Sequence, residues 1–333
     1  MTRCCGLEEA PEGAAYGSVD DTAQTAAISS AQHTRLTTRA AALSTAVALL
    51  LIALKAWAWL ASSSVAMLAS LADSTLDFVA SLITYYAVRY AAAPPDNEHR
   101  FGHGKAEAFA GLMQSGLVAL SGVLIAAEAV PRFFVHTQIS QGMASLAVMV
   151  ISVVLTAGLI SAQTQAIRRT GSVATRADRL HYVGDLISNL AVMVGIGAAA
   201  WFGWVWADAA AALIVAAWLA WGAYHVAREA GDHLLDRELP DEARARIRAL
   251  AESDPQLGRV HDLRTRTSGP YVHIQFHVEL APSMTLEDAH QIVVAAEERI
   301  RAEFPTADII IHPDPRGRAE PHGHEDFERR RGH

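Results

Sequence analysis

Six apolar segments, each about 20 residues or longer, occupy most of the sequence before residue 230 and constrain its fold more than any other feature. An α-helix needs that length to cross the hydrocarbon core of a bilayer. Because the bilayer interior offers no water to backbone polar groups, such segments must form helices there. The sequence therefore predicts a bundle of six transmembrane helices. The segments are residues 40–61, 65–89, 107–131, 143–167, 178–202 and 206–228.

Basic residues flank these segments unequally. Six crossings place both chain ends on one side, and the loops and flanks on that side carry Arg35, Arg39, Arg89, Arg100, Lys105, Arg168, Arg169, Arg176, Arg179 and Arg228. The other side carries Arg132. By the positive-inside rule both termini are expected in the cytoplasm. Tryptophans in the last outer turn suit an aromatic belt at the opposite interface: Trp201, Trp204 and Trp206.

A soluble domain is expected where the charge rises, over residues 231–315. Residues 241–252 and 286–303 have helical spacing, and 258–267 and 271–280 read as strands joined by Ser268-Gly269-Pro270. Strict alternation in the second strand predicts one core face and one polar face. With a short strand at 308–312, the order is α-β-β-α-β, as in ferredoxin-like metallochaperone domains. The fold class is thus an α-helical membrane protein, with a transmembrane domain over 39–230 and this cytoplasmic domain.

Both ends of the chain are expected to be disordered tails. Residues 1–38 are small and acidic, without a signal-peptide pattern, and residues 316–333 carry scattered histidines. The only cysteines, Cys4 and Cys5, cannot build a disulfide framework or a cysteine-based zinc finger. Metal chemistry must therefore use histidines and carboxylates. A net charge of -8 and the absence of a basic face with aromatics argue against a nucleic-acid partner.

Charged residues inside two of the predicted spans are costly and indicate a function. Asp73 and Asp77 lie four residues apart in the second span, and His181 and Asp185 four apart in the fifth. That spacing puts each pair on one helix face. An aspartate at the centre of a membrane helix costs about 2.5 to 3.5 kcal/mol. A divalent cation would offset the cost, since three carboxylates and one imidazole suit zinc or Fe(II).

Two alternatives to a metal site remain open for these acids, a water-filled polar path without metal and structural pairing with buried bases. Lys55 is the sole Lys or Arg deep in a span. The neighbouring Trp57 and Trp59 predict that Lys55 extends to the outer interface. One lysine cannot neutralise three aspartates, which favours the metal site.

Four stretches of the chain, in the right order, resemble the cation diffusion facilitator family, and most closely its bacterial zinc and ferrous-iron efflux branch. They are residues 71–77, 101–107, 181–185 and 261–270, with the sequences LADSTLD, FGHGKAE, HYVGD and HDLRTRTSGP. The resemblance covers roughly residues 35–315. It implies a homodimer whose transport site, formed by Asp73, Asp77, His181 and Asp185, opens alternately to cytoplasm and periplasm. It also implies zinc, cadmium or Fe(II) as substrate.

The resemblance implies further sites. A loop site falls on Asp96, His99 and His103, and a binuclear site in the soluble domain on His261, His277, His290, His312 and Asp314. A salt bridge at the dimer interface falls on Lys105 and Asp236. Taken singly, these residues are equally typical of ordinary exposed side chains. His273, Glu107 and Glu128 match no family ligand, and His273 is expected on the polar surface.

The resemblance, together with the predicted topology, implies proton-driven export from the bacterial cytoplasm across the inner membrane. Carboxylate and imidazole bind metal only when deprotonated, so protons and metal compete for the site. The ions expected are zinc, Fe(II) or cadmium as substrate and as structural or regulatory ions, with no other cofactor. An intramembrane metalloenzyme lacks support, since the sequence has neither His-Glu-x-x-His nor Gly-x-Ser-x-Gly. A passive channel is disfavoured because a four-ligand site binds too tightly for fast conduction.

Overall fold

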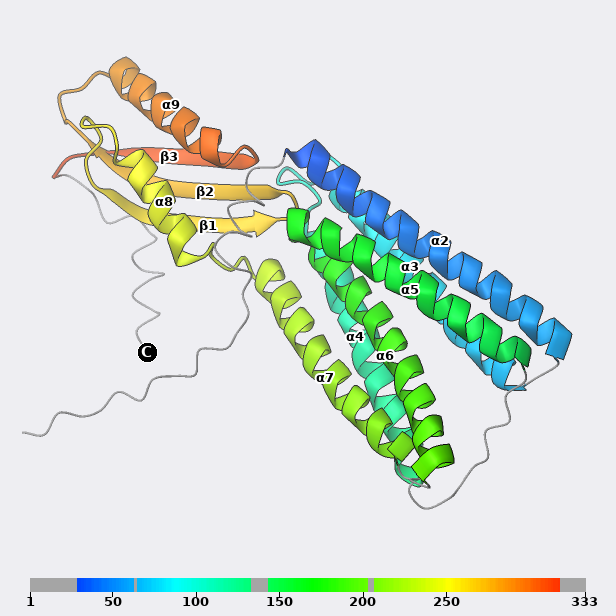
Figure 1. Ribbon diagram of the computed structural model, residues 1–333. Coiled ribbons are helices and arrows are strands. Elements are labelled where there is room, and N and C mark those ends of the chain that lie inside the picture. The colour runs from blue at the N-terminus through cyan, green and yellow to red at the C-terminus, as the bar shows by residue number, and fades with distance from the viewer. Residues whose placement is uncertain (1–28, 63–64, 133–142, 203–206, 318–333) are drawn as a thin grey trace, which may run out of the picture.

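A computed structural model of the chain describes residues 29–62, 65–132, 143–202 and 207–317 (Figure 1). The described part before residue 235 is a bundle of six long helices. They are α2 (Ser30–Ser62), α3 (Val65–Ala91), α4 (Lys105–Arg132), α5 (Met143–Thr170), α6 (Val173–Phe202) and α7 (Ala207–Leu234). The predicted class, a helical membrane domain followed by a small α/β domain, is confirmed.

Four of these helices, α2, α4, α5 and α7, contain windows long and apolar enough to cross a membrane. Helices α3 and α6 are not among the four, although they have 27 and 30 residues. They are the helices that carry the aspartates of the predicted transport site, and charge lowers the hydropathy of a helix. The count of six crossings therefore stays a prediction.

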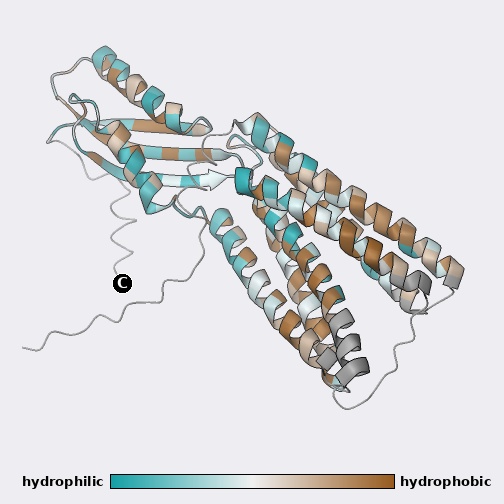
Figure 2. Ribbon diagram, in the orientation of Figure 1, coloured by the Kyte–Doolittle hydropathy of each residue, from teal (hydrophilic) through white to brown (hydrophobic). Residues whose placement is uncertain are grey.

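The outer surface of the helical bundle is apolar. Large side chains such as Leu60, Leu76 and Ile214 are about 70% exposed, at 72%, 69% and 71%. Figure 2 shows hydrophobic residues along the helices away from the soluble domain and hydrophilic residues near it. A band of exposed apolar side chains on long helices is typical of a lipid-facing surface.

Helix α2 begins earlier than expected, so the boundary of the predicted N-terminal tail at residue 38 is wrong. Ser29 Oγ accepts from Gln32 N at 3.3 Å, and Gln32 Oε1 accepts from Ser29 N at 3.4 Å. These reciprocal bonds form a capping box, which satisfies backbone donors at a helix start. The remainder of that tail, the tail residues 318–333 and the aromatic belt of Trp201, Trp204 and Trp206 fall outside the side chains that the structure describes.

The soluble domain has the predicted α-β-β-α-β order. Its elements are α8 (Asp241–Ala251), β1 (Val260–Ser268), β2 (Tyr271–Leu280), α9 (Leu286–Glu303) and β3 (Ala307–Pro315). The sheet order is β1-β2-β3, with β1 antiparallel and β3 parallel to β2. Alternate residues of β2, including Ile274 and Phe276, pack with Ile247 of α8 and Ile300 of α9 in one core. Thr285 caps α9 by accepting from Asp288 N.

A backbone contact joins the soluble domain to the loop between α3 and α4. A Cβ added at Gly104 would lie 2.2 Å from the carbonyl oxygen of Ser268, and Gly269 in the β1–β2 turn lies against Gly104 in return. Gly269 also has a φ of 56°, which side-chain-bearing residues rarely adopt. The two glycines therefore permit a contact that no larger residue allows. It fixes the soluble domain at one end of the bundle (Figure 1).

Candidate metal centres

Three of the four predicted transport ligands lie together between α3 and α6. His181 Nε2 is 2.8 Å from Asp77 Oδ1 and 3.6 Å from Asp185 Oδ2. One ligand atom from each of Asp77, His181 and Asp185 lies within 4.8 Å of the others. The spacing of four residues between His181 and Asp185 brings both side chains to the same face of α6, as expected. The three donors can surround one cation.

Asp73, the fourth predicted ligand, is not in this group. It lies one turn before Asp77 on α3 and is more exposed than Asp77 in the isolated chain. Its carboxylate interacts electrostatically with Asp77, Lys55 and Glu128. Its role as a ligand stays a prediction, which requires a side-chain movement toward His181.

Lys55 does not extend to the outer interface, so that expectation is wrong. Its Nζ donates to the carbonyl oxygen of Ser70 at 3.2 Å and to Ser74 Oγ at 2.6 Å, both on α3. The neighbouring Trp57 is 62% exposed, whereas Lys55 points toward α3. A hydrogen-bonded position against α3 satisfies two of the three ammonium donors inside the bundle.

A buried polar network, which sequence reasoning missed, joins four helices around Asp178 of α6. Gln163 Nε2 of α5 donates to Asp178 Oδ2 at 2.8 Å, and Ser81 Oγ of α3 donates to Oδ1 at 3.3 Å. Gln163 Nε2 also donates to Ser44 Oγ of α2 at 3.0 Å, and the Tyr182 hydroxyl lies 2.9 Å from Ser81 Oγ. Asp178 precedes His181 by three residues. The network therefore fixes the turn of α6 that carries His181, the histidine of the predicted transport site.

A second metal-competent group lies in the loop between α3 and α4. His99 Nδ1 is 3.4 Å from Asp96 Oδ1, and His103 Nε2 is 3.3 Å from Asp96 Oδ2. One donor atom of each residue lies within 4.8 Å of the others. Gly102, with a φ of 80°, turns the chain between the two histidines. The loop thus brings together the three residues that the resemblance implied.

Backbone hydrogen bonds hold the carboxylate of Asp96 in place. The His99 N–H donates to Oδ1 at 2.6 Å and the Glu98 N–H at 2.9 Å. These donors, that of His99 foremost, lower the pKa of Asp96 below its usual value. The carboxylate is therefore ionised, and able to bind a cation, throughout the neutral range.

A third group lies at the edge of the soluble domain. His277 Nδ1 is 3.0 Å from Asp314 Oδ2, His261 Nε2 is 3.3 Å from the same oxygen, and His312 Nε2 is 3.4 Å from Asp314 Oδ1. The parallel pairing of β2 with β3 places His277 beside His312. His261, His277 and Asp314 meet the same 4.8 Å criterion. His290 is exposed on α9 and is not part of this group.

Asp262 joins the soluble group, although no sequence signal had marked it. The pairing of β1 with β2 shifts between His261 and Arg264, and Asp262 has a φ of 48°. This irregularity brings Asp262 Oδ2 to 3.8 Å from His277 Nε2. Asp262 is therefore a further candidate ligand or a partner that orients His277.

The remaining predicted residues lie at the junction of the two domains. Lys105 Nζ is 3.0 Å from Asp236 Oδ1, and Arg266 also reaches Asp236, at 3.2 Å. A place for the first pair at a dimer interface stays a prediction. His273 is not on the polar surface, and that expectation is wrong. It is 6% exposed, its Nδ1 lies 3.1 Å from Asp308 Oδ2, and the Phe101 ring covers it.

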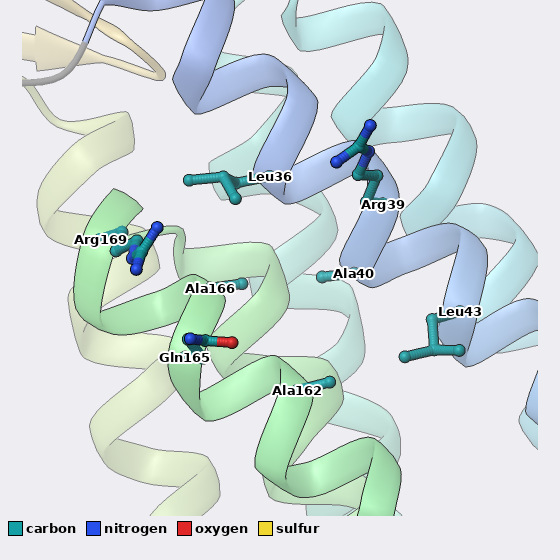
Figure 3. Close-up of a pocket in the computed structure, with 8 residues that line it drawn as sticks. All are labelled: Leu36, Arg39, Ala40, Leu43, Ala162, Gln165, Ala166 and Arg169. Atoms are coloured by element: carbon teal, nitrogen blue, oxygen red, sulfur yellow. The ribbon is translucent and has the colours of Figure 1, made fainter.

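A surface cavity between α2 and α5 is separate from these three centres (Figure 3). Its lining is apolar apart from one glutamine and two arginines, one arginine from each helix. It contains no acid and no histidine, so it is not a candidate metal site. The lining residues are Leu36, Arg39, Ala40, Leu43, Ala162, Gln165, Ala166 and Arg169.

Comparisons with known proteins account for nearly all of the described chain. The cation efflux transmembrane domain matches residues 41–235, and the cytoplasmic domain of cation efflux proteins matches residues 239–316. The cation-efflux pump FieF of Shewanella oneidensis is 41% identical over 272 residues, which is 82% of this chain and 92% of that protein. FieF of Escherichia coli K12 is 40% identical over 281 residues, 84% and 93% of the two chains.

A solved structure of the metal-bound C-terminal domain of the CzcD transporter from Thermotoga maritima is also similar. The identity is 26%, and the match covers 24% of this chain and 93% of that one, with a TM-score of 0.23.

Proposed function

The chain belongs to the cation efflux family, and from that premise we propose that it is a proton-coupled antiporter that exports divalent metal cations from the cytoplasm. The family makes it a transporter of cations and not an enzyme. The antiport mechanism, the metals and the residues are the proposed part. The substrates proposed are zinc, Fe(II) and cadmium, because the site offers carboxylate oxygens and one imidazole nitrogen.

The contact between His181 and Asp77 is the main observation that supports proton–metal exchange. A ring nitrogen and a carboxylate oxygen at 2.8 Å would repel each other unless a proton lay between them. A metal bound through both atoms must expel that proton. Metal and proton therefore exclude each other at this contact, which is the requirement for exchange.

Access to the site from alternate sides would convert this competition into export. On the cytoplasmic side, a divalent cation displaces the proton shared by His181 and Asp77 and binds both donors. A more acidic periplasm protonates the same donors and displaces the ion. The arrangement of helices supports a site that two helix groups share, since Asp77 belongs to α3 while His181 and Asp185 belong to α6.

We further propose that the protein is a homodimer in the bacterial inner membrane with both termini in the cytoplasm. The basic loops support this orientation. So does the contact of Gly104 with Ser268, because it requires the α3–α4 loop and the soluble domain to lie on one side of the membrane. Metal in the soluble and loop groups would stabilise one arrangement of the dimer and report the cytoplasmic metal level.

Zinc uptake into inside-out vesicles with an acidic interior tests the proposal. The intact protein is expected to take up zinc and release protons from the vesicle, and a protonophore is expected to stop uptake. Asp77→Ala should abolish uptake. Asp241→Ala is the matched control, since Asp241 is an exposed side chain at the start of α8, away from all three centres. Equal uptake by the intact protein and Asp77→Ala would remove the proposed site.

A further inference from the structure

Lys55 is a partly buried lysine of the helical bundle that belongs to none of the three candidate metal centres. It lies on α2, and its ammonium is hydrogen-bonded to the carbonyl of Ser70 and the hydroxyl of Ser74. Both partners are uncharged. A lysine inside a membrane bundle is expected to have a functional reason, since the insertion cost is about 2.5 to 3.5 kcal/mol.

The two partners of Lys55 belong to the same helix stripe as the transport aspartates. Ser70, Asp73, Ser74 and Asp77 follow the spacing i, i+3, i+4 and i+7, which lines one face of α3. The ammonium is hydrogen-bonded at 2.6 Å to the hydroxyl of Ser74, which lies between Asp73 and Asp77 on this face. It is therefore close enough to act on the charge of the site, while its hydrogen bonds keep it against the two serines.

We infer that Lys55 is the fixed counter-charge of the transport site. It binds no metal itself, and it lowers the affinity of the aspartates for a cation so that the ion can leave. This inference rests on the proposed function. A fixed positive charge repels a divalent ion twice as strongly as it repels a proton at the same place, so it weakens metal binding more than proton binding.

The positive charge of Lys55 makes the net charge of the loaded transport site zero. Three ionised aspartates and one ammonium have a net charge of two negatives, which one divalent cation cancels. The loaded site is then neutral. When the helices enclose it in the low-dielectric interior, no desolvation cost of a net charge arises. Without the ammonium the loaded site would keep one negative charge. The lysine thus matches the site to a divalent cation.

A purely structural role for Lys55, as a link between α2 and α3, makes a different prediction. Loss of a structural link would loosen the site and weaken metal binding. Loss of a counter-charge would strengthen metal binding and slow metal release. The sign of the change in affinity therefore separates the two roles.

The test compares Lys55→Gln with Lys55→Arg in zinc transport by proteoliposomes. Glutamine keeps a donor for Ser70 and Ser74 but removes the charge, whereas arginine keeps the charge. For Lys55→Gln, the KM for zinc is expected to fall at least about tenfold, and kcat is expected to fall as release slows. Lys55→Arg should keep the KM of the intact protein. The control Arg89→Gln removes a positive charge from the cytoplasmic end of α3 and should change neither constant.

A direct zinc titration completes the test. Both Lys55 variants are titrated in a His103→Ala, His277→Ala background, which removes a ligand from each of the other two centres. An unchanged or higher dissociation constant in Lys55→Gln would overturn the inference. Failure of both Lys55→Gln and Lys55→Met to give folded protein would do the same, because it would assign the lysine to packing. Absence of uptake by the intact protein would instead overturn the proposed function.

Discussion

Gly104 lies at the contact between the two domains, and Gly116 faces open space in α4. Replacing each glycine by alanine is expected to change the stability of the protein in opposite directions. Gly104→Ala adds a methyl group 2.2 Å from the Ser268 carbonyl oxygen and 2.7 Å from Gly269 N. Real Cβ contacts do not fall below about 3.0 Å. Since both neighbours are backbone atoms, no side chain can rotate away. The α3–α4 loop and the β1–β2 turn must therefore move apart.

The expected cost of Gly104→Ala is about 1 to 3 kcal/mol, the usual range for overpacking a tight contact. The backbone of Gly104 itself does not require glycine, since its φ is not positive. The cost thus comes from the contact alone. Gly116→Ala in α4 is the matched control, because a Cβ there meets nothing within 4 Å. That substitution is expected to stabilise the helix by about 0.8 to 1 kcal/mol.

Thermal unfolding of the purified protein in detergent measures both effects. Gly104→Ala should lower the melting temperature, and Gly116→Ala should raise it. Limited proteolysis should cut residues 92–104 faster in Gly104→Ala, because the loop loses its cover. A melting temperature for Gly104→Ala equal to that of the intact protein, with an equally protected loop, would refute the close contact.

Three further predictions concern the polar groups. Asp178→Asn should lower the free energy of unfolding by about 1 to 3 kcal/mol, because the amide has one acceptor oxygen where the carboxylate offers two, one to Ser81 and one to Gln163; denaturation in detergent measures it. His277→Ala should abolish the rise in melting temperature that zinc gives the soluble domain without raising the KM for transport. For Asp96, whose folded pKa lies below its unfolded value, the stabilising contribution is complete above about pH 3.9 and is lost as the pH falls through the lowered pKa. Hydrogen exchange of residues 97–103 should show this acid transition, and Asp96→Asn should remove it.

Segment length and spacing were sufficient to predict the long helices and to place His181 beside Asp185. The i,i+4 spacing of His181 and Asp185 guarantees a shared face on any helix, and length alone identifies helical segments in a bilayer. The sequence did not reveal Asp178, because its importance depends on Gln163 of α5 and Ser81 of α3 lying beside it. Contacts between distant helices depend on rotation and register, which periodicity along one helix does not specify.

Asp262 and the start of α2 were missed for local reasons. Strict alternation assigns residues of β1 to one face or the other, but the irregular pairing after His261 interrupts the alternation and turns Asp262 toward His277. A bulge inserts one residue and leaves little trace in composition. At α2, the S-x-x-Q pattern of Ser29 and Gln32 is a readable start signal. The low hydropathy of the residues before the span concealed it.

The two incorrectly placed side chains, Lys55 and His273, share one physical cause. The alternation in β2 correctly puts His273 on the face opposite the α8–α9 core, yet that face is covered by Phe101 from a loop of the membrane domain. The aromatic neighbours of Lys55 suggest an interfacial position, yet α3 offers a carbonyl and a hydroxyl within reach and three carboxylates nearby. Periodicity assigns a residue to a face of its own element, whereas another element decides whether that face meets water. The environment of a polar residue at such a junction can therefore be read only from the structure, as it is for Lys55 beside the proposed transport site and for His273 at the domain boundary.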